Sequence, residues 1–243
     1  MKRVFLFAAL LAAAGAQAGF LDQLRGVLQG ETTDAGETTS LSNQEMIQGV
    51  LDALSVGVQR AVAELGQAGG YLDDPQVRIP LPAQLRSVES LLRRVGQDRY
   101  ADQFIASMNG AAEQAVPVAK DIFLKTIRQM NVEDARGIVT GSDDAATEYF
   151  RSHTREELQA AFLPIVRDAT DEAQVTARYK QLADRAQSLS GGLVKPETLD
   201  LDRYVTDKAL DGLFVKLADE ERRIREDPVA RSTELLKKVF GRR

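Results

Sequence analysis

From residue 42 onward, apolar residues recur every three or four positions, with polar residues between them. The first such stripe on one helical face consists of Ile47, Val50, Leu51, Leu54, Val58, Val62 and Leu65. The alternation typical of a half-buried strand is confined to residues 77–81, which lie between prolines. The sequence therefore predicts an all-α fold, a single bundle-like domain of short helices over residues 42–243.

Capping and breaking residues divide this domain into successive helices. Thr154 with Glu157 has the pattern of a capping box, which predicts a helix start there and a bend at Pro164. His153, the single histidine of the chain, would then be an exposed cap residue between two helices. A long helix is expected to open at Thr206.

The C-terminal part of the chain is rich in charge. The run 219–227 is expected to be a solvated helix face with ion pairs inside the helix. A last helix at 228–241 combines basic residues with an apolar stripe that we expect to pack on the bundle. Binding of this helix to a membrane surface is the less favoured alternative.

Residues 69–82 form an irregular connection about as long as loops normally are. Three prolines stiffen it, and Tyr71, Leu72 and Ile79 supply apolar side chains. We expect this segment to be pinned to the core, to be functional, or both.

A set of polar residues around this connection supplies the candidate ligand-binding site. Asn109 and Glu113 lie four residues apart on one helix face, close to its inward side. A half-buried carboxylate needs partners, and the candidates are Arg78 in the loop and Arg136 beside Asp134. These residues form either the polar floor of a small-ligand pocket or a structural network that locks the loop to the bundle, and the network is favoured. We further predict that Arg78 reaches a carboxylate from the helix of Glu113 or of Asp134.

The sequence carries no signature of catalysis. It has no cysteine, and it contains no glycine-rich phosphate loop, serine elbow or dinucleotide fingerprint. Its acidic clusters lack the order of a calcium loop. We therefore predict no cofactor, no metal site and no catalytic residue. Glu113 and Asp134 could still meet across helices as the paired acids of a hydrolase.

The N-terminus predicts export. Lys2 and Arg3 precede an apolar run at 4–14 and the Ala-Gln-Ala sequence at 16–18, which together have the pattern of a secretory signal peptide over residues 1–18. Cleavage would leave Gly19 first, although an uncut N-terminal anchor is the alternative. Without cysteine the chain is not a lipoprotein, so we predict a periplasmic protein.

Between the signal peptide and the domain lies a segment of different composition. Residues 20–28 have apolar residues at helical spacing, and they either pack on the domain or dock elsewhere. A threonine- and glycine-rich linker follows, in which Gly-Glu-Thr-Thr occurs twice, and we expect it to be disordered. The predicted organisation is thus 1–18, 19–41 and 42–243.

The overall charge limits the partners. The formal net charge is −5, and loss of Lys2 and Arg3 with the signal peptide changes it to −7. An acidic chain repels nucleic-acid phosphates and anionic headgroups. We therefore expect no nucleic acid as a partner, and we expect an unknown small molecule or envelope protein instead.

Ordered stretches along the domain carry a family resemblance. They lie at 70–72, 77–82, 108–109, 111–113, 115–117, 133–138, 144–147, 149–150, 204–206, 208–214 and 235–241. In these stretches the chain resembles the bacterial domain-of-unknown-function 4197 family of exported proteins, from about residue 44 to residue 241. The resemblance implies export and one helical domain, and it supplies no mechanism and no catalytic residue.

These observations favour an exported helical protein that acts as a non-enzymatic binding or interaction module. Export, the absence of a catalytic signature and the polar cluster motivate this hypothesis. A carboxylate-based hydrolase of envelope components is the first alternative, and a membrane-surface scaffold is the second.

Overall fold

The computed structural model of the chain describes residues 43–189 and 200–226. The predicted signal peptide, the segment 19–41 and the last predicted helix at 228–241 lie outside these ranges. Within them the chain is all-α, as predicted, and no strand occurs. No helix of these ranges is long and apolar enough to cross a membrane.

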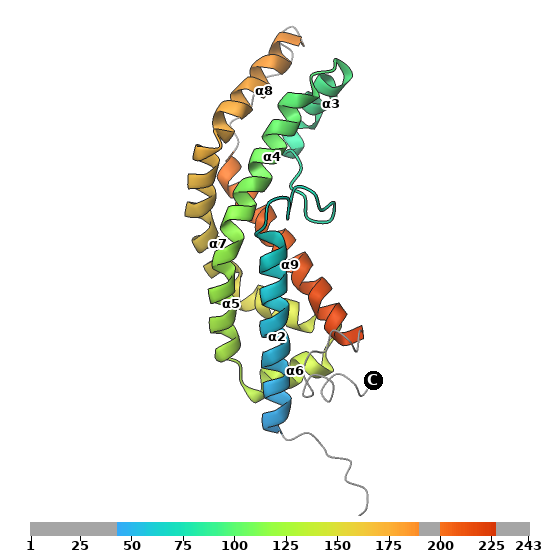
Figure 1. Cartoon of the computed structure of the whole chain (residues 1–243), viewed down its shortest axis with the longest axis vertical. Helices are drawn as coiled ribbons and strands as arrows, with labels where there is room; N and C mark the ends of the chain where they lie inside the picture. The colour runs from blue at the N-terminus through green and yellow to red at the C-terminus, as the bar shows by residue number, and fades with distance from the viewer. Residues whose placement is uncertain (1–42, 190–199, 227–243) are drawn as a thin grey trace, which may run out of the picture. The chain divides into compact units, whose positions relative to one another are not determined.

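In chain order the helices are α2 (Asn43–Leu65), α3 (Arg86–Arg94), α4 (Asp98–Ala115), α5 (Ala119–Arg128), α6 (Val132–Thr140), α7 (Ala145–Glu172), α8 (Val175–Leu189) and α9 (Leu201–Glu226) (Figure 1). From α2 to α8 the helices follow one another with short connections, apart from the segment after α2. Two 3-10 turns, η1 (Ala83–Leu85) and η2 (Val116–Val118), lead directly into α3 and α5.

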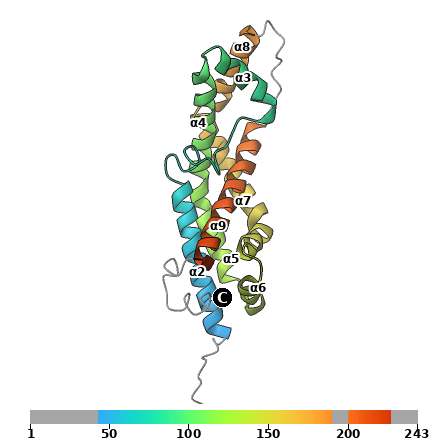
Figure 2. The ribbon, with the colours of Figure 1, turned by 90° about the vertical axis from the view of Figure 1, so that its right-hand side faces the viewer.

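The packing is organised around α9. This helix lies along α7 and also packs against α2 and α4 (Figures 1 and 2). The apolar stripes that the periodicity predicts face inward, and aromatic rings join the helices where these stripes meet. The ring centroid of Phe123 in α5 lies 4.9 Å from that of Phe150 in α7 and 6.3 Å from that of Phe214 in α9.

The predicted helix start at Thr154 is wrong. α7 runs without a break from Ala145 to Glu172, through both Thr154 and Pro164. The Thr154 hydroxyl donates a hydrogen bond to the Phe150 carbonyl at 2.7 Å, so it bonds back into the helix instead of capping a new one. Exposed His153 consequently lies inside α7 rather than between helices.

The predicted start of α9 is also wrong. The helix begins at Leu201, five residues before Thr206. Asp200 Oδ1 accepts a hydrogen bond from the Arg203 amide at 3.0 Å, which makes Asp200 the capping side chain. α7 is therefore longer than the short helices that the sequence predicts, and the long helix expected from Thr206 starts earlier than expected.

Residues 66–82, here called the loop, connect α2 to η1 without regular structure. Tyr71, Val77, Ile79 and Leu81 of the loop are buried in the main core, with exposed fractions of 0 to 5%. The prediction that this connection is pinned to the core is confirmed.

Candidate functional site

Two side chains of α4 hold the backbone of the loop. Asn109 is fully buried, and its Oδ1 accepts a hydrogen bond from the Ile79 amide at 2.8 Å while its Nδ2 donates to the Ile79 carbonyl at 2.9 Å. Half-buried Glu113 accepts hydrogen bonds from the amides of Tyr71 and Leu72 on Oε1, at 3.1 and 3.2 Å. Asn109 and Glu113 thus form the structural network that the sequence favours, with the loop backbone as their partner.

α9 holds the loop from the other side. The buried Tyr71 hydroxyl donates to the Ala209 carbonyl at 2.7 Å, and the Tyr204 hydroxyl donates to the Pro80 carbonyl at 2.9 Å. Burial raises the pKa of Tyr71, and the negative charge of Glu113 adds to this effect. The phenol therefore stays protonated and acts as a donor.

Gly212 permits this close approach of α9 to the loop. A Cβ atom at this position would lie 2.7 Å from Tyr71 Cε1 and 3.1 Å from Val77 Cβ. Distances this short force neighbouring atoms to move, so only glycine fits here without rearrangement. This requirement explains a glycine in a helix interior, where it costs about 1 kcal/mol relative to alanine.

An ion-pair cluster adds a third attachment. Lys216 of α9 is 8% exposed, and its Nζ contacts Glu64 of α2 at 2.8 Å and also Asp74 of the loop. Burial alone would lower the pKa of Lys216, but hydrogen bonds to Asp74 and Glu64 outweigh it and raise the pKa. The lysine is therefore a fixed cation that joins loop, α2 and α9.

The predicted contact of Arg78 with a carboxylate is wrong. Val77 and Ile79 turn into the core, and Arg78 between them is exposed. It makes no ion pair with any residue that the structure describes. The extended backbone places alternate side chains on opposite sides, and the two apolar neighbours decide which side Arg78 takes.

Asp134 and Arg136 lie far from Asn109 and Glu113. They belong to α6, which packs on the N-terminal half of α2, whereas the loop begins at the C-terminal end of α2 (Figure 1). Asp134 forms a capping box with Asn131, in which its amide donates to Asn131 Oδ1 at 2.9 Å and its Oδ2 accepts from the Asn131 amide at 3.1 Å. The candidate residues therefore divide into two separate groups, and the proposed pairing of Glu113 with Asp134 is wrong.

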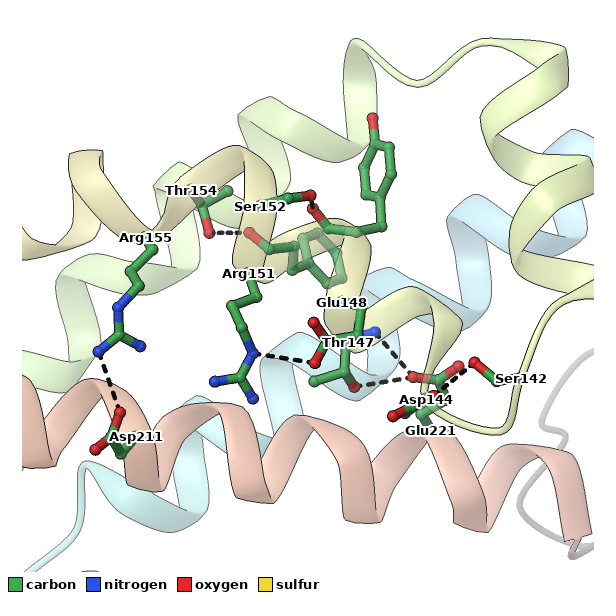
Figure 3. Close-up of polar contacts among 12 residues, drawn as sticks. Ser142, Asp144, Thr147, Glu148, Arg151, Ser152, Thr154, Arg155, Asp211 and Glu221 are labelled. Carbon is green, nitrogen blue, oxygen red and sulfur yellow. Dashed lines mark hydrogen bonds and ion pairs between the residues drawn. The ribbon is translucent and has the colours of Figure 1, made fainter.

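The outer side of the loop borders a groove, here called the loop groove. Its basic side chains are Arg78 of the loop, Arg86 at the start of α3, and Lys208 of α9. Its one carboxylate, Asp211, is paired with Lys208 at 3.3 Å and with Arg155 of α7 at 3.2 Å (Figure 3). The groove encloses about 790 Å³ including its open side.

The electrostatics of the loop groove favour an anion. Arg86 is the first residue of α3, and no side chain caps that helix. A cation at a helix N-terminus adds to the positive end of the helix dipole. Burial raises the pKa of Tyr204 in the groove, and the nearby charge of Arg86 opposes this rise.

A second polar cluster, not predicted from the sequence, lies at the start of α7 (Figure 3). Glu221 of α9 accepts hydrogen bonds from the amides of Ala146 and Thr147 at 3.0 and 2.9 Å, and from the Thr147 hydroxyl at 2.9 Å. Arg225 Nη2 donates to Glu221 Oε1 at 2.6 Å and to the Ile138 carbonyl at 2.8 Å. Thr147, Glu221 and Arg225 are here called the capping cluster. Glu221 supplies the negative charge that a helix N-terminus favours, and Arg225 is its counter-charge.

The capping cluster corrects the prediction for the run 219–227. The expected ion pairs within the helix are present, from Asp219 to Arg222, Glu220 to Arg223 and Glu221 to Arg225, while Asp227 lies outside the described residues. The side chains of Glu221 and Arg225 are only 7% and 4% exposed, however, so this part of α9 is not a solvated face. The apolar register of the helix could have shown this. Glu221 follows Leu217 by four residues and precedes Ile224 by three, which places it on the inward face.

Several stretches of the family resemblance lie in this part of the fold. Those at 70–72 and 77–82 belong to the loop, and those at 108–109, 111–113, 204–206 and 208–214 belong to α4 and α9, which hold the loop. A family model described as "Protein of unknown function (DUF4197)" matches residues 40–241, nearly the whole chain. The chain belongs to this DUF4197 family. Neither the curated proteins nor the solved structures contain a match to it.

This DUF4197 chain offers little for metal binding in its described ranges. No group of three or more histidine, aspartate or glutamate side chains there could hold a metal ion. His153 stacks on the Tyr149 ring at a centroid distance of 4.1 Å, and its Nδ1 lies 2.7 Å from the Tyr149 carbonyl oxygen.

Proposed function

We propose that this DUF4197 protein is an exported, non-enzymatic binding module, and that the loop groove binds an oxyanion such as a phosphate or carboxylate group of a small molecule. One observation carries the proposal. Arg78, Arg86 and Lys208 converge on one groove of a chain whose formal net charge is −5. Neither arginine forms an ion pair with a described residue, so both guanidinium groups are available to a ligand. A planar guanidinium group can donate two hydrogen bonds at once to two oxygens of a carboxylate or phosphate.

The anchoring of the loop supports this function. Five side chains hold the loop in place, and its outward residue Arg78 is not needed for any of their contacts. The five are Asn109, Glu113, Tyr71, Tyr204 and Lys216. A surface that is ordered before binding loses less conformational entropy when the ligand arrives. Functional residues are typically carried by loops that a rigid scaffold positions.

Titration calorimetry of the purified chain with sodium pyrophosphate tests the proposal. Arg78→Ala and Arg86→Ala should each weaken binding about tenfold, because each removes a charge-assisted hydrogen bond. Arg128→Ala is the matched control, since this exposed arginine lies in the last turn of α5, outside the groove lining, and its removal should leave binding unchanged. Equal affinity of all variants, or no binding by the unmodified chain, would contradict the proposal.

A second arm separates a free ligand from a membrane surface. Anionic vesicles should bind less tightly than pyrophosphate at physiological salt, because the groove is small and salt screens exposed charges. Tight vesicle binding without pyrophosphate binding would instead favour the membrane-surface scaffold.

Export is proposed on the pattern of residues 1–18. N-terminal sequencing of the protein purified from a periplasmic fraction should begin at Gly19. A protein that keeps Met1, or that stays with the cytoplasmic fraction, would overturn this part of the proposal.

A further inference from the structure

The structure contains one buried hydroxyl that no described group binds. Thr206 of α9 is 0% exposed, and its Oγ1 has no hydrogen-bond partner. A buried threonine in a helix ordinarily donates to the carbonyl four residues before it. Thr126 and Thr154 do so here, at 3.1 and 2.7 Å, whereas Thr206 does not. An unpaired buried hydroxyl is costly, and either a water molecule or a ligand in the groove would satisfy it.

Thr206 lines a second groove, here called the α7–α9 groove, which encloses about 740 Å³ including its open side. It is lined by Glu156, Gln159 and Arg167 of α7, by Arg203 of α9 and by Asp200, which caps α9. It shares no residue with the loop groove and lies between a different pair of elements.

The antiparallel register of α7 and α9 orders the charges along this groove. Gln159 Nε2 donates to Asp207 Oδ1 at 2.9 Å, and Arg155 pairs with Asp211 at 3.2 Å. Extended along both helices, this register places Thr206 level with residue 160. Glu156 then lies about 6 Å to one side of Thr206 along the axis, and Arg203 lies about 4.5 Å to the other side.

The two ends of the groove therefore differ in charge. At one end Glu156 forms no ion pair with a described residue. At the other end Arg203 also forms none, while Arg167 lies 3.6 Å from Asp202 and Asp200 uses Oδ1 to cap α9. The available anion and the available cation lie about 10 Å apart along the axis, with the unpaired hydroxyl between them.

From this arrangement we infer that the α7–α9 groove binds a short zwitterion of dipeptide size, with its ammonium group at Glu156 and its carboxylate at Arg203 and the Thr206 hydroxyl. An extended dipeptide spans about 7 Å, and the long side chains at both ends cover the remaining distance. The Thr206 hydroxyl would then donate to a carboxylate oxygen, and such a charge-assisted bond is among the stronger ones.

Titration calorimetry with alanyl-alanine tests this inference, and Thr206→Val is the decisive variant. Valine removes the hydroxyl and keeps the shape, so it should weaken binding about tenfold, whereas Thr206→Ser should keep most of the affinity. Blocking both ends of the dipeptide as acetyl and amide should abolish binding, because both charges are lost. No binding, equal binding by Thr206→Val, or equal binding of the blocked dipeptide would each overturn the inference.

Stability without ligand gives an independent readout. Thr206→Val should be at least as stable as the unmodified chain, because it removes an unsatisfied buried group. Thr126→Val is the matched control: it loses a hydrogen bond inside α5, so it should lower stability and leave dipeptide binding unchanged. Destabilisation by Thr206→Val would mean that the hydroxyl is already paired in the free protein and would overturn the inference. Arg78→Ala, which tests the loop groove, should not affect dipeptide binding.

Discussion

Glu113 and Glu221 each accept hydrogen bonds from two consecutive backbone amides, but they do so in different surroundings. Glu113 holds the amides of Tyr71 and Leu72 in the loop, is half-buried, and has no ion-pair partner in the described ranges. Glu221 holds two amides at the start of α7, is buried, and is bound by Arg225. A carboxylate that keeps contact with water can anchor a loop without a counter-charge, whereas a fully buried one requires it.

The difference also predicts how each anchor fails. Loss of Glu113 would leave two amides near the surface, where water can replace the carboxylate in part. Loss of Glu221 would leave two buried amides and a buried guanidinium group with no nearby anion. Variants of both anchors and of their neighbours test this difference.

Glu221→Ala should lower the free energy of unfolding by about 3–5 kcal/mol, because it leaves Arg225 buried without its partner. Urea denaturation followed by circular dichroism measures this loss. The double variant Glu221→Met with Arg225→Leu should recover part of it, since no unpaired charge remains while the amides of Ala146 and Thr147 stay unpaired. Asp219→Ala, which removes an exposed ion pair of the same helix with Arg222, should cost less than about 1 kcal/mol. A loss of similar size for Glu221→Ala and Asp219→Ala would refute the comparison.

Asn109→Leu should lower the free energy of unfolding by about 2–3 kcal/mol, because it leaves the buried amide and carbonyl of Ile79 without partners. The same denaturation experiment applies. Ser107→Ala is a control on the same helix, because the Ser107 hydroxyl bonds only to the carbonyl of Phe104. If Asn109→Leu behaves like Ser107→Ala, the loop does not depend on the Asn109 amide.

Glu113→Gln should cost about 1 kcal/mol, because the amide oxygen can still accept both loop hydrogen bonds but loses the charge. Glu221→Gln should cost clearly more, since Arg225 then lacks its counter-charge. The ratio of the two losses measures how much of each anchor depends on charge. Equal losses of stability in the two variants would show that buried Arg225 does not require the negative charge of Glu221.

The smallest effect concerns the pH dependence at the Asp74–Lys216 contact. The hydrogen bond from Lys216 lowers the pKa of Asp74 below its ordinary value of 3.8. The carboxylate therefore contributes stability above about that pH, and the contribution is lost as the pH falls through the lowered pKa. The stability difference between the unmodified chain and Asp74→Asn should be constant near neutral pH and shrink in the acid range below 3.8. A difference that stays constant down to acid pH would exclude this ionic contribution.

The sequence predicts the fold better than it predicts the site. Apolar periodicity identifies α2 and places Asn109 and Glu113 on an inward face. It fails at Thr154, because a threonine can bond back into its own helix as easily as it can start a new one. Local pattern alone does not distinguish these two uses of the hydroxyl.

The site is harder to predict than the fold, because Asn109 and Glu113 bind backbone groups of the loop rather than side chains. Nothing in the sequence marks the Ile79 amide or the Tyr71 amide as a binding partner. Arg78 is therefore the more visible candidate partner for the Glu113 carboxylate, although the loop amides take that place. Glu221 is missed for a related reason, since a dense charged run predicts solvent exposure unless its register against Leu217 and Ile224 is followed. Tertiary contacts decide both cases.

α9 contacts both the loop and the start of α7, and the order of these contacts along the helix determines which region opens first when the helix unfolds locally. Along α9, Ala209, Gly212 and Lys216 meet the loop. Between about one and three turns further along, Glu221 meets the start of α7 and Arg225 meets Glu221 and the Ile138 carbonyl of α6. Fraying of α9 from Glu226 backwards would release the start of α7 before it releases the loop. Amide hydrogen exchange is therefore expected to quicken first at Ala146 and Thr147, and the loop amides of Tyr71 and Ile79 should open only when the helix detaches as a cooperative unit.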